Sequence, residues 1–124
     1  MNAGETFHAQ APGSTRPHLY VAVTDPDPEG NFVIANITSQ SESKDQSCVL
    51  DVGDHPFIRK QSVVNYAEAR ITNQDAVSAG ARRGVIQYDA PVTPEALAKI
   101  QAGALASPQT ELGVKAAVRA ALGP

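Results

Sequence analysis

Two apolar stretches in the first third of the chain predict a β-hairpin. Residues 18–24 and 32–38 are rich in the β-branched and aromatic side chains that are typical of strands. Between them, residues 25–31 hold two prolines and a glycine, which favour a reversal of the chain. We therefore expect residues 19–23 and 32–37 to pair antiparallel, with alternate side chains in the core and on the outer face.

Shorter apolar stretches further along the chain predict the remaining strands. The candidates lie at residues 48–50, 61–66 and 84–88, and residues 67–71 either continue the second of these or bend into a strand of their own. The polar segment 39–47, with Lys44 and Asp45 at its tip, predicts an exposed loop. The pattern therefore favours a mainly β fold over most of the chain.

The C-terminal third predicts two α-helices. Thr93 is followed by a proline and a glutamate, which is the pattern of an N-cap, a first helical position and an acidic first turn. Ser107, also followed by proline, predicts a second N-cap. Apolar residues then recur at helical spacing, at Leu97, Ile100 and Ala104 in the first helix and at Val114, Ala117, Val118, Ala121 and Leu122 in the second.

Length and composition indicate a single globular domain. The chain has 124 residues, of which 42% are hydrophobic and 19% charged. It holds three Phe, three Tyr and no Trp, so the core must consist mainly of aliphatic side chains. The single cysteine, Cys48, excludes an internal disulfide and is expected to be a small buried hydrophobe.

The formal net charge of −3 provides no overall positive field that would attract nucleic acid. Five basic residues nevertheless lie in the middle third, where they form either a patch that steers a phosphate backbone or an ordinary solvated surface. They are Arg59, Lys60, Arg70, Arg82 and Arg83.

The chain shows no signal peptide and no apolar run of membrane-spanning length, so we expect a cytoplasmic protein without a membrane partner. Its three histidines and one cysteine are too widely spaced for a zinc site. We therefore expect neither a metal nor a cofactor.

Several short motifs resemble those of the MazF/PemK ribonuclease toxins. Residues 16–23 look like the Arg-Pro-x-Leu-Val-Val strand of that family, and residues 32–39 are similar to its next strand, which ends in a Thr-Ser pair. Residues 61–64 and 69–71 resemble the family's Ser-Val-Val and Ile-Arg-Thr elements. The resemblance covers roughly residues 16–77.

The resemblance implies an SH3-like antiparallel barrel, here with a barrel core over residues 1–90 and two C-terminal helices over residues 93–122. It further implies a toxin-like endoribonuclease of a toxin–antitoxin module, which cleaves single-stranded RNA without a metal. The implied partners are single-stranded RNA, an antitoxin protein and a second copy of the chain in a homodimer. The alternative is a non-catalytic SH3-like barrel that binds a protein or peptide.

Carried over to this sequence, the family's catalytic arginine and threonine are Arg16 and Thr38. A guanidinium and a hydroxyl suit a reaction in which a ribose 2′-hydroxyl attacks its own phosphate, because both donate hydrogen bonds to the developing negative charge. His55 is the only obvious acid or base for chemistry at neutral pH in the middle of the chain, and we assign it the proton exchange.

The RNA-binding residues that accompany these three are expected to be Ser39, Arg59, Lys60 and Arg70. Each catalytic candidate also has a purely structural interpretation. Arg16 could pair with Glu5 or Asp27, Thr38 could cap the turn that follows it, and His55 before proline could be a hydrogen-bonded turn residue. A concave cluster of the three would favour phosphate chemistry, whereas a flat apolar groove would favour peptide binding.

Overall fold

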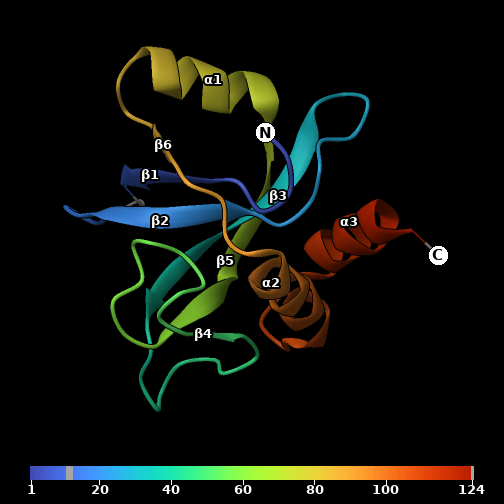
Figure 1. Ribbon diagram of the computed structural model, residues 1–124. Helices are drawn as coiled ribbons and strands as arrows, with labels where there is room; N and C mark the ends of the chain where they lie inside the picture. The colour runs from blue at the N-terminus through green and yellow to red at the C-terminus, as the bar shows by residue number, and fades with distance from the viewer. Residues whose placement is uncertain (11–12, 124) are drawn as a thin grey trace.

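The computed structural model describes residues 1–10 and 13–123 as six strands and three helices (Figure 1). Residues 11, 12 and 124, which belong to the predicted domain, lie outside that description. The strands are β1 (Thr6–Gln10), β2 (Pro17–Ala22), β3 (Asn31–Ser39), β4 (Val49–Leu50), β5 (Ser62–Asn73) and β6 (Gln87–Asp89). The helices are α1 (Gln74–Arg82), α2 (Pro94–Ala106) and α3 (Leu112–Leu122).

All six strands belong to one antiparallel sheet, in the order β4-β5-β3-β2-β1-β6. The sheet curls into a half-barrel, with β4 and β6 as its edges (Figure 1). The prediction of a mainly β fold is confirmed. The SH3-like identity of the barrel stays a prediction.

The predicted hairpin is confirmed by the pairing of β2 with β3, in which Leu19 lies opposite Ile37 and Ala22 opposite Ile34. The carboxylate of Asp27 closes the turn between them, because it accepts hydrogen bonds from the backbone N–H groups of Glu29 and Asn31, each at 2.9 Å. The sequence of this turn therefore fixes the register of β2 against β3, the strand that carries Thr38 and Ser39.

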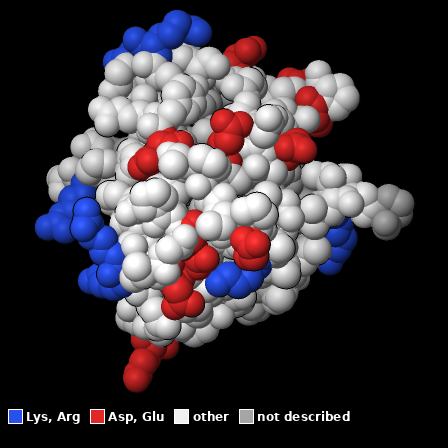
Figure 2. Space-filling view, viewed as in Figure 1, with Lys and Arg blue, Asp and Glu red and all other residues white. Residues whose placement is uncertain are grey.

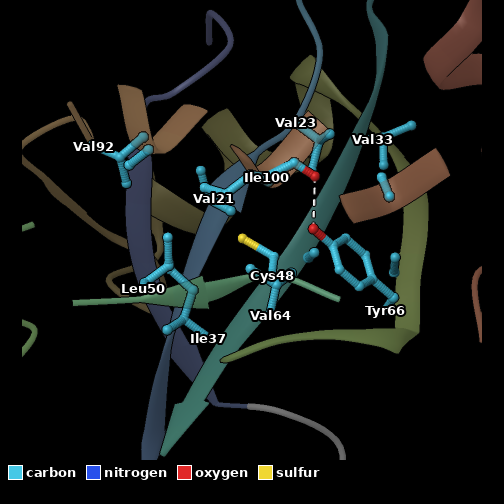
Figure 3. Close-up of a cluster of buried hydrophobic side chains, with 14 of the residues drawn as sticks. Val21, Val23, Val33, Ile37, Cys48, Leu50, Val64, Tyr66, Val92 and Ile100 are labelled. Atoms are coloured by element: carbon cyan, nitrogen blue, oxygen red, sulfur yellow. Dashed lines mark hydrogen bonds between the residues drawn. The ribbon is translucent and has the colours of Figure 1, made fainter. Parts of the chain in front are cut away.

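Each face of the sheet is covered by helices, which explains why β2 and β3 have few exposed positions (Figure 1). On one face, Val21, Val33, Val64 and Tyr66 of the sheet pack against Ile100 of α2 (Figure 3). Val118 of α3 belongs to the same core. On the other face, Phe7, Tyr20, Phe32 and Ile34 pack against Val77 of α1. Cys48 is buried in the first of these cores, as predicted.

The prediction of two helices is wrong, because α1 is a third. Its N-cap is Asn73, whose side chain accepts a hydrogen bond from the N–H of Asp75 at 2.9 Å. Only Val77 and Gly80 of this helix are buried. Because Val77 is the one large apolar side chain that α1 buries, the sequence of this helix shows no apolar residues at helical spacing.

The start of the last helix also differs from the prediction. Thr93 is the N-cap of α2, as expected, and its hydroxyl accepts from the N–H of Ala96 at 3.1 Å. Ser107 is instead the C-cap of α2, since a residue before proline avoids the helical conformation. Helix α3 begins at Leu112, after Glu111, which makes no side-chain capping hydrogen bond.

Residues 67–71 continue β5, with a register shift opposite residues 34–36 of β3. In the parts of the chain that the structure describes, no helix is both long and apolar enough to cross a membrane.

Candidate functional site

Four of the seven predicted site residues line one hollow, which we call the basic hollow. They are Thr38, Ser39, Arg59 and Lys60, and the hollow has a volume of about 250 Å³. Its remaining wall includes the apolar side chains of Leu19, Ile37, Phe57 and Ile58.

The antiparallel pairing of β3 with β5 brings these residues together. Ser39, at the end of β3, lies opposite Ser62, at the start of β5. Arg59 and Lys60 lie just before β5, separated from it by Gln61, so the loop that carries them returns beside the end of β3. Residues about 20 positions apart in the sequence thus meet at one end of the sheet.

The basic hollow is positively charged. No carboxylate lines it, and Arg59 and Lys60 form no ion pair with any residue that the structure describes. Figure 2 shows Lys and Arg side chains gathered on the left flank, beside the β1–β2 turn and the β4–β5 loop of Figure 1. Despite its net negative charge, the molecule therefore presents a local cationic surface suited to an anion.

Arg16 lies at the same end of the sheet, in the turn that leads into β2, but it does not line the basic hollow. Strand β2 begins where its partner β3 ends, which places Arg16 near Ser39 and the residues that follow it. The side chain is exposed, and it pairs with neither Glu5 nor Asp27. Its guanidinium is available to a ligand.

Thr38 is contacted by a residue that the sequence analysis did not identify as functional. The ammonium group of Lys44 donates to the hydroxyl oxygen of Thr38 at 3.2 Å and to the carbonyl oxygen of Ser39 at 2.6 Å. Lys44 stands in a polar loop with no motif around it, so nothing in the sequence distinguished it from a solvated lysine.

His55 is buried, with a relative exposure of 1%, and it does not line the basic hollow. Its Nδ1 accepts a hydrogen bond from the N–H of Phe57 at 3.0 Å, so the proton of the neutral ring is on Nε2. Nε2 lies 2.6 Å from the carbonyl oxygen of Ala90 and 3.1 Å from the hydroxyl of Thr6. In this position His55 is a hydrogen-bonded turn residue that fixes the loop carrying Arg59 and Lys60.

Arg70 lies on a different surface. Its guanidinium carbon is 5.7 Å from the centre of the Tyr20 ring, which is a cation–π distance. Tyr20 belongs to the core under α1, so this contact holds Arg70 away from the basic hollow.

A second group of ionisable residues joins β1 to β6. Nε2 of His8 lies 2.7 Å from a carboxylate oxygen of Asp89. The hydrogen bond from His8, followed by that from the backbone N–H of Ala90, holds the pKa of Asp89 below its ordinary value.

Among residues 1–10 and 13–123, no group of three or more His, Cys, Asp or Glu side chains is placed to hold a metal ion.

No protein-family model matches this chain, and no curated protein matches it either. The similarity to MazF/PemK toxins therefore rests on the short motifs quoted above.

Proposed function

We propose that this protein binds single-stranded RNA at the basic hollow and cleaves it as a metal-independent, MazF/PemK-like endoribonuclease. The observation that carries the proposal is the gathering of Thr38, Ser39, Arg59 and Lys60 around one cavity that holds no carboxylate. Unpaired cations in a groove provide most of the affinity of proteins for single-stranded nucleic acid.

In this proposal a phosphate of the RNA lies against Thr38, and Arg16 approaches it from the adjacent turn. The ribose 2′-oxygen attacks the phosphorus, the bond to the 5′-oxygen breaks, and the products are a 2′,3′-cyclic phosphate and a 5′-hydroxyl. Solvent water accepts the proton of the 2′-hydroxyl, and the leaving 5′-oxygen takes up a proton from solvent. Arg16 stabilises the charge on the phosphorane oxygens, and Thr38 orients the phosphate.

His55 enters the proposal in a changed role. Both of its ring nitrogens are engaged within the protein, so it acts as a positioning residue for the loop of residues 57–60. A direct proton exchange by His55 stays a prediction, and it requires the ring to leave the carbonyl oxygen of Ala90.

The experiment is a digest of a long single-stranded RNA by the purified protein in EDTA. We expect Arg16→Ala to lower the cleavage rate by about 10²- to 10³-fold, since a lost charge-stabilising donor costs that much. Arg119→Ala, which removes an exposed arginine from α3, is the matched control and should cleave at the wild-type rate. Equal cleavage by wild type and Arg16→Ala would contradict the assignment of Arg16.

A second candidate function is peptide binding by a non-catalytic domain, and one observation favours it. A groove of about 400 Å³ lies between α3 and the β2–β3 turn, with Pro26, Pro28, Phe32, Ile71 and Ala121 among its lining residues. An antitoxin segment is a fitting occupant in a toxin–antitoxin module. If the wild-type protein neither binds nor cleaves RNA, this candidate replaces the ribonuclease. The homodimer stays a prediction.

A further inference from the structure

A second cavity adjoins the basic hollow, and Thr38 lines both. This loop hollow, of about 190 Å³, lies between the loop of residues 40–47, the start of β5 and the connection between α2 and α3. Lys44, Asn65 and Gln109 provide polar groups to its wall. A chain that passes over Thr38 therefore meets polar side chains on both sides.

Lys44 has the properties of a residue that binds an anion. Two of its three N–H donors point to Thr38 and Ser39, at 3.2 and 2.6 Å, and the third is left for a ligand. The side chain is exposed, and no carboxylate pairs with it in the described part of the chain. Its charge lies next to the residue that the proposed function places against the phosphate.

Hydrogen bonds within the loop of residues 40–47 hold Lys44 in place. The side-chain amide of Gln46 donates to the carbonyl oxygens of Ser41 and Lys44, both at 2.8 Å, and accepts from Gln40 at 2.9 Å. Such preorganisation lowers the entropy cost of binding a ligand.

Asp45 is the one carboxylate that lines the loop hollow. It accepts hydrogen bonds from the hydroxyl of Ser107 and, at 2.9 Å, from the backbone N–H of Ser47. Its oxygens are thereby engaged by donors of the protein, and it ties the loop to the end of α2. Both side chains are charged, but only Lys44 keeps a hydrogen-bonding group for a ligand, because the oxygens of Asp45 are taken up within the protein.

Asn65 and Gln109 add a second kind of recognition. Within the described residues, neither side-chain amide has a hydrogen-bond partner in the protein. Amides carry both donors and acceptors and pair with the edges of unstacked bases in single-stranded RNA.

We propose that the loop hollow is a second nucleotide subsite, in which Lys44 binds the phosphate next to the one at Thr38, and Asn65 and Gln109 contact its base. The inference rests on the proposed function and extends it from one phosphate to two successive ones. Because the two hollows share Thr38, the subsite sets which nucleotide lies beside the scissile bond.

The first test measures binding of a fluorescein-labelled 2′-O-methyl RNA octamer by anisotropy at several salt concentrations. This RNA lacks the 2′-hydroxyl nucleophile, so binding is observed without cleavage. We expect Lys44→Gln to reduce the slope of log K against log salt by about 0.7, the value for one lost phosphate contact on a single strand. Lys44→Arg should keep the wild-type slope, and Arg119→Gln, on α3, is the matched control for charge.

The outcomes separate this inference from the function on which it rests. If Arg59→Gln reduces the slope and Lys44→Gln does not, the subsite is wrong and the basic hollow stands. If the wild-type protein does not bind the octamer, both are wrong. Unchanged melting temperatures of the variants will show that the fold is intact.

The second test concerns the base. We expect the wild-type protein to bind A, C and U octamers with different affinities, and Asn65→Ala combined with Gln109→Ala to bring those affinities together while leaving the salt slope unchanged. Equal affinities of the wild-type protein for the three octamers would overturn the base contact.

Discussion

Gly103 of α2 packs directly against Tyr66 of β5 and against Cys48, the residue before β4, so that no side chain fits at this position. A Cβ atom there would lie 2.9 Å from the Cβ of Cys48 and even closer to the hydroxyl of Tyr66. That hydroxyl donates to the carbonyl oxygen of Ile100 at 2.6 Å (Figure 3). Burial raises the pKa of Tyr66, which keeps its hydroxyl protonated as a donor.

Gly103→Ala should therefore lower the free energy of unfolding by about 1–3 kcal/mol, the usual cost of overpacking a core. Gly113→Ala in α3 is the matched control, because a Cβ atom at that position would have no neighbour within 4 Å. It should raise the stability by about 0.5–1 kcal/mol, since alanine favours a helix. Urea denaturation followed by circular dichroism measures both.

A double variant tests whether the contact with the Tyr66 hydroxyl causes the loss of stability in Gly103→Ala. Tyr66→Phe removes the hydroxyl that the new methyl group of Gly103→Ala would meet, so the two changes together should destabilise the protein by less than the sum of their separate effects. Strict additivity would show that the cost of Gly103→Ala arises elsewhere.

At the scale of an element, the loop of residues 40–47 is held by the contact of Asp45 with Ser107. Burial raises the pKa of Asp45, but the hydrogen bonds from Ser107 and Ser47 lower it by more, so the folded value lies below the ordinary 3.8. The unfolded chain then binds the proton more readily, and the stability from this carboxylate is lost as the pH falls below about 5.

Asp45→Asn should accordingly show a smaller fall in melting temperature between pH 6 and pH 3 than the wild-type protein, because it has no charge to lose. Glu42→Gln in the same loop is the control, since the Glu42 side chain is exposed and makes no hydrogen bond within the described residues. A fall in Asp45→Asn equal to that of the wild type would contradict the role of Asp45.

The elements predicted correctly from the sequence are those in which the apolar pattern and the turn or cap residues both match the observed structure. The β2–β3 hairpin combines two apolar strands with a turn of proline, aspartate and glycine, and α2 has a complete N-cap. Helix α1 was missed because Val77 is its one large buried side chain, and β1 because Phe7 is its only large apolar residue. Ser107 was predicted to be the N-cap of the last helix and is the C-cap of α2, because a serine followed by proline fits either position.

At the scale of the whole molecule, the candidate site depends on strand order, which local pattern cannot provide. The motifs identified Thr38 and Ser39, and charge identified Arg59 and Lys60, but only the pairing of β3 with β5 shows that they share one hollow. The burial of His55 depends on Ala90 and Thr6, which are 35 and 49 residues away. Lys44 lies beside Thr38 because the loop of residues 40–47 folds back on the end of β3.

The covering of the sheet by α3 is likewise a property of the whole molecule, and it can be tested. Val118 is fully buried against the sheet. Val118→Ala removes the equivalent of two buried methylene groups and should cost about 2 kcal/mol of unfolding free energy. Val85→Ala, at a position that is 55% exposed, is the matched control and should change it by less than about 0.5 kcal/mol.

Two probes followed in urea show whether α3 belongs to the cooperative unit. Circular dichroism reports mainly the helices. Tyrosine fluorescence reports the strands, through the buried Tyr66 in β5 and Tyr20 in β2 and the exposed Tyr88 in β6. If α3 is an integral layer, Val118→Ala shifts both transitions together to lower urea. A shift in circular dichroism alone would mean that α3 unfolds separately, and the groove between α3 and the β2–β3 turn would then have a movable wall.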